Sequence, residues 1–269
     1  MANNKVEIEN NLNLIRSLIT KHKRHDHIFA GVGMFIIISL TITLLVLFLD
    51  LVFDGYPRFN LDFLTNFPSR RATAAGILSA WVGSSLVLIV TFFAAVPLGI
   101  AAGVYLEEYA KKNWFSDLIE INVTNLAGVP SIIYGLLALG LFVYGFGLGQ
   151  TILTAGLTLA LLMLPIVIVA TREAIRAIPI HIREAAYAVG ATKWQVSLHH
   201  VIQYSYGGIL TGVIIGMARA IGETAPVITI GALTFIAFLP PSPVGLEPPF
   251  INFEWLEAGF TVLPIQMFN

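Results

Sequence analysis

Arg219 and Glu223 could act together, because they stand four residues apart inside a long apolar stretch. A spacing of four places two side chains on one face of a helix, where a guanidinium and a carboxylate can pair. The planar donor fork of arginine suits oxyanions such as phosphate, and Glu223 would limit how tightly Arg219 holds an anion. Two interpretations stay open: the pair lines a path for an anion, or it is a buried ion pair that locks two helices together.

Weaker candidates for the same path lie in other apolar stretches. Arg172 ends one of them and could contact or gate an anion, or anchor a helix end at a membrane interface. Three polar residues surround Pro130 and could line the path or bond to backbone and neighbouring helices: Asn125, Ser131 and Tyr134. By contrast, Glu107 and Glu108 stand just before Lys111 and Lys112, a pattern that predicts a solvated face.

A polar segment at 183–195, REAAYAVGATKWQ, separates two of the apolar stretches. Its alanines favour a short helix, and Gly190 stands where a helix needs a left-handed residue after its end. Thr192, followed three residues later by Gln195, predicts a capping box at the start of a second helix. Because mere connectors are usually short, this segment is predicted to be a compact helix–turn–helix that grips a soluble molecule.

The apolar stretches that must position these groups are long. Hydrophobic residues make up 57% of the chain and charged residues 12%, against about 25% charged in ordinary soluble domains. Five runs exceed the ~20 residues that a helix needs to cross a bilayer: 28–53, 80–106, 118–145, 148–171 and 208–236. The chain is therefore predicted to be an all-α, polytopic transmembrane helical bundle with about five spans. We expect a polar N-terminal segment at 1–27, amphipathic and basic, and a membrane domain at 28–269 whose polar loop covers 172–206.

The distribution of positive charge orients these spans. With the N-terminus in the cytoplasm, eleven Lys and Arg residues fall on the inner side and three on the outer side, while Arg219 lies within a span. Cytoplasmic loops are the ones that carry such an excess of Lys and Arg. The N-terminus and the loop at 172–206 are therefore predicted to be cytoplasmic.

The sequence shows no signature of a catalytic site. The sequence contains no G-x-x-x-x-G-K-[ST] phosphate loop, so ATP hydrolysis, if it drives the process, is predicted to reside on a separate subunit. The chain has no cysteine, and no zinc-type or Ser/His/Asp spacing stands out. We expect neither an enzyme nor a metal site, and we read His22, His25 and His27 as a cationic flank.

Several motifs resemble one family of transporters. Glu184, Ala185, Ala186 and Gly190 are similar to the EAA-xxx-G motif of ABC-importer permeases. Four longer strings resemble the phosphate-importer branch of that family, the PstA type, and occur in the same order: VPLGIAAGVYLEEYA, NLAGVPSIIYGL, LPIVIVATREAIRAIP and ARAIGETAP. The resemblance covers roughly residues 72–269 and implies the type I importer permease (MetI-like) fold.

The resemblance also implies a role and a set of partners. The EAA loop would be the coupling helix that docks into a groove of a cytoplasmic ATPase, through Arg183, Glu184, Ala185, Ala186, Gly190 and Thr192. A second permease subunit, two ATPase subunits and an external phosphate-binding protein would complete the importer within membrane lipid. ATP and Mg would be used by the ATPase, this chain would bind no cofactor, and nucleic acid is not expected. The implied location is a bacterial or archaeal plasma or inner membrane.

The chain departs from the family pattern in two ways. The family motif continues to a hydrophobic residue and Leu-Pro, whereas this sequence has His200, Ile202 and Gln203 there. Without that proline, the return into the fifth span is expected to be straighter. The family normally has six spans, and the five predicted here would mean a fragment, a truncated form or a natural short form.

Three alternatives stay open. A permease of the same fold could carry another oxyanion, such as sulfate or molybdate. A secondary transporter could run on protons through Glu223, although a structured cytoplasmic loop argues against it because such a transporter has no ATPase to contact. A non-transporting assembly protein is the third, and it would leave Arg219 without a purpose beyond packing.

Overall fold

The computed structural model describes residues 2–71, 74–111, 113–244 and 250–267, without the side chains of residues 2–22 and 24. The chain divides into two units, Met1–Asn60 and Leu61–Asn269, and each is described by itself. Regular structure in the described part is helical, beside one isolated antiparallel bridge between Val244 and Ile251. The predicted all-α class is therefore confirmed.

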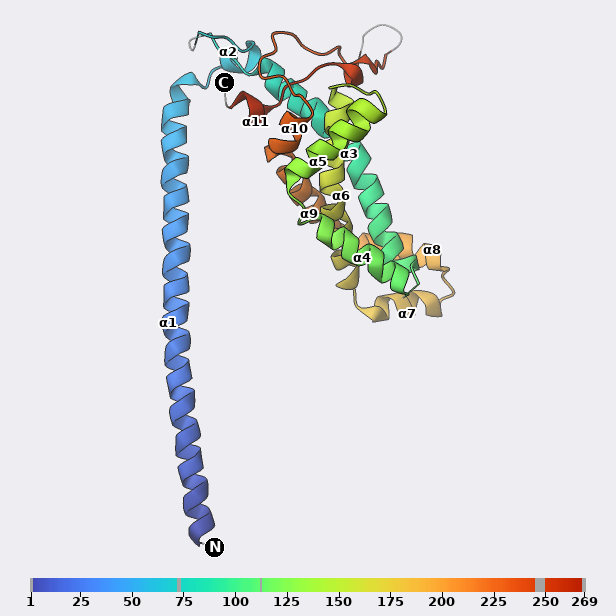
Figure 1. Cartoon of the computed structure of the whole chain (residues 1–269). Coiled ribbons are helices and arrows are strands. Elements are labelled where there is room, and N and C mark those ends of the chain that lie inside the picture. The colour runs from blue at the N-terminus through green and yellow to red at the C-terminus, as the bar shows by residue number, and fades with distance from the viewer. Residues whose placement is uncertain (1, 72–73, 112, 245–249, 268–269) are drawn as a thin grey trace. The chain divides into compact units, whose positions relative to one another are not determined.

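The first unit is the long helix α1 (Ala2–Gly55) followed by the short η1 (Tyr56–Arg58), drawn in blue in Figure 1. Its stretch His25–Arg58 is apolar enough to cross a membrane, and it contains the predicted run 28–53. Apolar side chains are exposed all around this stretch, for example Phe35 and Leu51, as expected of a helix whose solvent is lipid. Helix α1 runs through residue 27 without a break, so the domain boundary proposed there stays a prediction, and most side chains of the predicted amphipathic segment lie outside the described ones.

The second unit holds the remaining elements. In chain order they are α2 (Leu61–Thr65), α3 (Leu78–Val104), η2 (Tyr105–Tyr109), α4 (Trp114–Leu126), α5 (Ser131–Ala138), η3 (Leu139–Gly145), α6 (Ile152–Arg176), α7 (Ile180–Ala188), α8 (Lys193–Val196), η4 (Ser197–Val201), α9 (Ile202–Gly222), α10 (Ala225–Thr229), η5 (Glu254–Glu257) and α11 (Leu263–Gln266). Counted with α1, the described chain has four helices able to span a membrane, or five with the bent pair α4–η3, which agrees with the predicted number.

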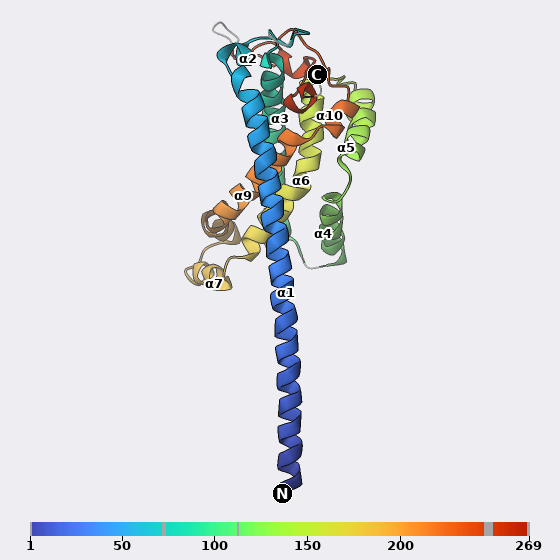
Figure 2. The same cartoon turned by 90° about the vertical axis from the view of Figure 1, so that its left-hand side faces the viewer.

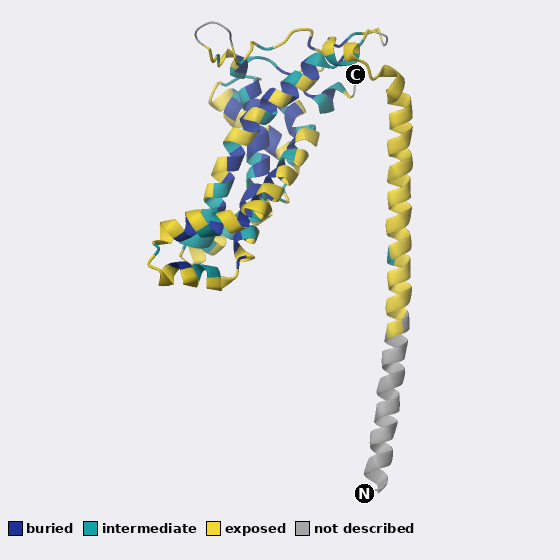
Figure 3. Cartoon of the chain, turned by 180° about the vertical axis from the view of Figure 1, so that it is seen from behind, coloured by how far each residue is buried: buried dark blue, intermediate teal, exposed yellow. Residues whose placement is uncertain are grey.

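Helix α6 is the centre of this unit and packs along both α3 and α9 (Figures 1 and 2). Glycines permit the close approach of α9. A Cβ atom at Gly208 would lie 2.7 Å from the Cβ of Ala174, and one at Gly212 would overlap Ala170. This small-residue spacing of four is a common way for helices to pack inside membranes, where no hydrophobic effect drives them together. Figure 3 shows the buried positions running along the inside of the unit.

The predicted third span is not a continuous helix. It divides into Trp114–Leu126 and Ser131–Gly145, whose axes differ by 104°. Pro130 stands at the break, because proline lacks the N–H that a continuing helix needs and disfavours helical geometry in the residue before it. The hydroxyl of Tyr134 donates to the carbonyl of Leu126 at 2.8 Å and so bridges the two halves.

The predicted fifth span, 208–236, is displaced along the chain. The continuous stretch is Lys193–Gly222, in which α8, η4 and α9 follow one another without a break, as the absent proline predicts. Beyond Gly222 the backbone turns extended at Glu223, and α10 follows with Pro226 in its first turn. Gly231, with a φ of +94°, then turns the chain away, so 223–236 does not continue the span.

The tail after 236 is more ordered than its proline-rich composition indicates. Trp255, Phe260 and Ile265 are buried in an apolar cluster with residues of α3 and α6. The backbone N–H of Leu263 donates to Ser84 Oγ at 2.8 Å. The described part of this tail therefore closes the end of the bundle that carries α10 and α11.

Candidate functional site

Arg219 and Glu223 form the pair that their spacing predicts. The guanidinium Nε donates to the Glu223 carboxylate at 3.1 Å, from the last turn of α9 to the residue that ends this helix. Glu223 borders the same cavity as Leu88, which lies about 15 Å along α3 from its first residue. The pair therefore lies at the end of α9 but level with the interior of α3 rather than with its first turn.

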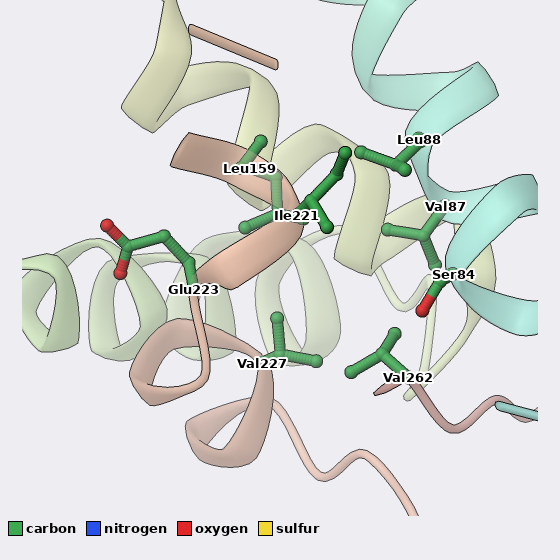
Figure 4. A pocket seen from close by; sticks show the side chains of 9 residues that line it. Ser84, Val87, Leu88, Leu159, Ile221, Glu223, Val227 and Val262 are labelled. Atoms are coloured by element: carbon green, nitrogen blue, oxygen red, sulfur yellow. The ribbon is translucent and has the colours of Figure 1, made fainter. Parts of the chain in front are cut away.

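One side of this pair is closed by apolar packing. The cavity that Glu223 borders measures about 10 Å³, roughly the space of one water-sized sphere, and is too small for an oxyanion. Its apolar walls come from four helices and the tail, among them Val87, Leu159, Val227 and Val262. Figure 4 shows the carboxylate of Glu223 pointing away from these side chains.

The other side of the pair is open. The Arg219 side chain is 42% exposed and that of Glu223 is 17% exposed. A charged side chain at this depth is unfavourable against lipid, so it faces a bundle interior or a water-filled cavity in membrane proteins generally. Because the described residues of the second unit leave Arg219 partly uncovered, another protein surface or an aqueous path is expected against it.

The three candidates around Pro130 meet this region differently. Ser131 and Tyr134 lie on α5, which packs against α10, where a Cβ at Gly135 would lie 2.7 Å from Pro226 Cα, whereas Asn125 lies on α4. Tyr134 is buried and its hydroxyl is committed to the bend between α4 and α5. Asn125 is exposed and Ser131 is partly exposed at the start of α5. A path-lining role for these residues stays a prediction.

Arg172 belongs to a different place. It lies about 20 Å along α6 from Leu159, the α6 residue that borders the Glu223 cavity. Its side chain is 7% exposed and pairs with Glu120 at 2.6 Å and Glu107 at 3.4 Å. Its surroundings are thus two carboxylates rather than the open face on which Arg219 lies, and its role toward an anion stays a prediction.

Arg172 is one member of what we call the Arg–Glu cluster, six residues from four elements. They are Glu107 and Glu108 of η2, Glu120 of α4, Arg172 and Arg176 of α6, and Arg183 of α7. The Glu108 side chain is only 8% exposed and that of Glu107 20%. The predicted solvated face at these two glutamates is therefore wrong, because arginines distant in sequence cover them.

The polar segment at 183–195 folds locally as its sequence predicts. Helix α7 ends before Gly190, whose φ is +87°. Thr192 and Gln195 form both halves of a capping box at the start of α8. The two short helices with the turn between them, residues 180–196, are called the α7–α8 knob below.

The motif residues of the α7–α8 knob divide between its two faces. Ala186 is buried against Ile175, Val196 and Val201, which fixes the knob to the bundle. Glu184, with a side chain 64% exposed, and Ala185 face outward, and His181 Nδ1 lies 3.3 Å from the Glu184 carboxylate. The outward face is thus available to another protein, while Arg183 turns inward to Glu108.

Sequence reasoning missed the partners of Arg183, although a signal existed. Two of the glutamates, Glu107 and Glu108, and the three arginines fall in segments that the predicted topology places on the cytoplasmic side. Charges near apolar helix ends that can pair are rarely left free, because an unpaired buried charge is strongly unfavourable. The separation along the chain hid which glutamate meets which arginine.

Comparison with known proteins finds transport-system permeases that are similar to this chain over most of its length. Residues 95–244 match the family described as binding-protein-dependent transport system inner membrane component. A probable ABC transporter permease protein, YqgI of Bacillus subtilis, is 32% identical over 240 residues, 88% of this chain and 77% of that protein. The phosphate transport system permease protein PstA of Haemophilus influenzae is 30% identical, over 89% of this chain and 84% of that protein.

A further relative is matched over less of its own length. The phosphate transport system permease protein PstA of Mycobacterium leprae is 40% identical to this chain. The matched region covers 73% of this chain and 60% of that protein. The family match covers more than half of the chain and includes both the α7–α8 knob and the Arg219–Glu223 pair. The chain therefore belongs to the inner-membrane components of binding-protein-dependent transport systems.

Proposed function

We propose that this chain is the transmembrane permease subunit of an ATP-driven ABC importer for inorganic phosphate. The observation that carries the proposal is the combination, in one unit, of a solvent-exposed EAA-type knob and a half-exposed arginine at the end of α9, level with the interior of α3. The phosphate assignment is supported by relatives from Haemophilus influenzae and Mycobacterium leprae whose names give phosphate transport.

We assign to Arg219 the role of binding phosphate as the anion crosses the membrane. Its guanidinium has donors beyond the one that meets Glu223, and planar pairs of donors suit phosphate oxygens. Glu223 neutralises the arginine when no anion is present, so that release remains feasible. The open face of the pair supports a second permease subunit there, with the path running between the two.

The α7–α8 knob is the part that we assign to the ATPase. Its exposed residues Glu184 and Ala185 would contact a groove of the ATPase, while Ala186 and Arg183 hold the knob to the bundle. Closure of two ATPase subunits on ATP and Mg would move the knob and shift the spans between inward-open and outward-open states. An external phosphate-binding protein would deliver the anion. This chain itself would bind no cofactor.

The orientation proposed is a cytoplasmic N-terminus and knob in a bacterial or archaeal plasma membrane. The excess of Lys and Arg on that side supports it. Because the chain has no cysteine, a single cysteine at the exposed Val189 can be labelled in cells without background. A membrane-impermeant maleimide should label this cysteine only after the cells are opened. Labelling in intact cells would show that the proposed orientation is wrong.

The test of function is transport by the complete complex in liposomes. The chain is purified with its partner permease and ATPases, and radiolabelled phosphate is supplied with the binding protein outside. ATP-dependent uptake that excess sulfate or molybdate does not reduce is the expected result. Uptake by this chain alone, driven by a proton gradient and abolished by an uncoupler, would instead support a secondary transporter that uses Glu223.

The knob assignment is tested by Glu184→Lys in the same complex. We expect uptake to fall about tenfold or more while ATP hydrolysis persists, because reversal of an exposed charge at the contact disturbs coupling rather than folding. Glu173→Lys is a matched control, since its side chain is also 64% exposed but lies on α6 outside the knob. Normal uptake by the Glu184→Lys complex would refute the assignment.

A further inference from the structure

We propose that Arg183 is a strut that joins α7 to the adjacent ends of both α3 and α6, so that movement of the knob carries those two helices together. The inference rests on the proposed function, because the knob bears the exposed Glu184 assigned to the ATPase. In this role Arg183 is a positioning residue: it touches neither phosphate nor ATPase and acts by transmitting displacement.

Every nitrogen of the Arg183 guanidinium is used in this joint. Nε and Nη2 both donate to Oε1 of Glu108, at 3.1 and 2.9 Å. Nη1 donates to the carbonyl of Ile178 at 3.1 Å, and Nη2 also donates to that of Ile175 at 3.0 Å. Ile175 lies in the last turn of α6, where helical C=O groups lack i+4 partners within the helix, and Ile178 lies in the short connection that follows. One side chain of α7 thereby holds both α6 and the segment η2 that ends α3.

Burial makes this joint stiff. The Arg183 side chain is 20% exposed and the Glu108 side chain 8%, so salt screens their attraction far less than it screens a surface pair. Separating the two would leave a buried carboxylate unpaired, which is strongly unfavourable. The pair is therefore expected to persist while the helices around it move.

Other contacts of the α7–α8 knob are less directional. Ala186 packs in an apolar cluster with Ile175 and Val201, and apolar packing permits sliding because it depends on area rather than on direction. Lys193 lies over the ring of Tyr109, with its Nζ 4.9 Å from the ring centroid. Tyr109 and Glu108 both lie in η2, a π-helical turn of the kind found frequently at functional sites.

The ion pairs of Arg176 in the Arg–Glu cluster join other elements and do not involve the knob. Arg176 pairs with Glu107, Glu120 and Glu173, which lie on η2, α4 and α6 and not on the knob. Glu108 pairs with Arg183 alone among the ion pairs that the described residues form. The two neighbouring glutamates of η2 thus serve two separate joints, and only the Arg183–Glu108 joint reaches α7. This separation provides a matched control within one cluster.

The test compares Arg183→Gln with Arg176→Gln in the complete complex in liposomes. For Arg183→Gln we expect ATP hydrolysis to continue while phosphate moved per ATP falls about tenfold, within the usual range of coupling between sites. Glu108→Gln should lower the same ratio, and Arg183→Lys should restore part of it. Arg176→Gln should keep the ratio within about twofold, since its pairs do not involve α7.

The outcomes separate the strut from the proposed function. If Arg183→Gln and Glu108→Gln keep the wild-type ratio while Glu184→Lys lowers it, the strut is wrong and the knob assignment stands. An equal loss of hydrolysis and transport also overturns the strut, because it indicates failed assembly instead of lost transmission. Should Arg183→Gln not assemble, Glu108→Gln and Arg183→Lys decide by the same ratio. Wild-type complex without ATP-dependent phosphate uptake would overturn both proposals.

Discussion

Two regions of this molecule use the same chemical groups in opposite ways. The Arg219–Glu223 pair comes from a single helix end, joins its two side chains at 3.1 Å, and leaves the arginine 42% exposed. The Arg–Glu cluster draws on η2, α4, α6 and α7, and its Arg172 is 7% exposed with two carboxylate partners. Both are guanidinium–carboxylate sites, yet one is open and local while the other is closed and joins distant segments.

The difference indicates which site can respond to a ligand. An arginine such as Arg172, which is buried and already paired with two carboxylates, would have to lose those contacts before it could bind an anion. Arg219 has exposed surface and one ion-pair partner among the described residues, so an anion could bind to it without disrupting the fold. The closed cluster is suited to hold helices in register, and the open pair is suited to exchange partners.

The largest expected effect is on stability, and it separates the two regions. Arg172→Ala should lower the free energy of unfolding by about 3 kcal/mol, because it removes two ion pairs from a largely buried arginine and leaves Glu107 and Glu120 to share Arg176. The Glu120 side chain is 38% exposed, so we expect a loss of stability at the lower end of the ~3–5 kcal/mol seen when a buried ion pair is broken. Arg219→Ala should change stability by less than about 1 kcal/mol, as expected of a partly exposed pair. Thermal unfolding of the purified complex in detergent measures both.

Equal destabilisation by the two variants would contradict this contrast. In that case the Arg219–Glu223 pair would be as much a structural lock as the Arg–Glu cluster, which is the second of the interpretations left open for it. A double variant, Arg172→Met with Glu107→Gln, removes opposite charges together and should recover part of the loss if an unpaired charge is its cause.

The next effect in size is on transport. Arg219→Gln should lower phosphate uptake roughly 10- to 100-fold, the equivalent of one or two charge-assisted hydrogen bonds. Arg219→Lys keeps the charge but not the planar fork and should fall between that variant and wild type. ATP-driven uptake in liposomes measures this effect. Uptake at the wild-type rate by the Arg219→Gln complex would show that Arg219 does not contact the phosphate.

Sequence reasoning succeeded where the determining contacts are local. The Arg219–Glu223 pair follows from a spacing of four, and the Thr192–Gln195 capping box from a spacing of three. Gly190 was identified as the left-handed residue after α7 because few other residues adopt a positive φ without strain. Each of these features depends on a few consecutive residues and on no tertiary contact.

It failed where the partner is distant or the chain turns back. Glu108 meets Arg183 across 75 positions, so a pattern of charges near Lys111 could not reveal that it is buried. The apolar content of 223–236 resembles a span, yet Pro226 and Gly231 redirect it against α5. Hydropathy measures the preference for lipid or core and does not distinguish a helix that crosses from one that turns back.

The smallest expected effect concerns Tyr134, which could belong with either region. Its hydroxyl donates to the Leu126 carbonyl at 2.8 Å across the bend of the third span. If that bond is its role, Tyr134→Phe should cost about 1 kcal/mol of stability, the usual net contribution of one hydrogen bond, and leave uptake nearly unchanged.

A role in lining the path predicts the reverse, a fall in uptake at unaltered stability. Unfolding and uptake measured on the same Tyr134→Phe preparation therefore place this residue with the closed, structural group or with the open pair. The neighbouring variant Ser131→Ala is the control, because Ser131 is only partly buried and starts the same helix. A loss of uptake shared by both variants would mean that α5 itself, rather than the Tyr134 hydroxyl, borders the route of the anion.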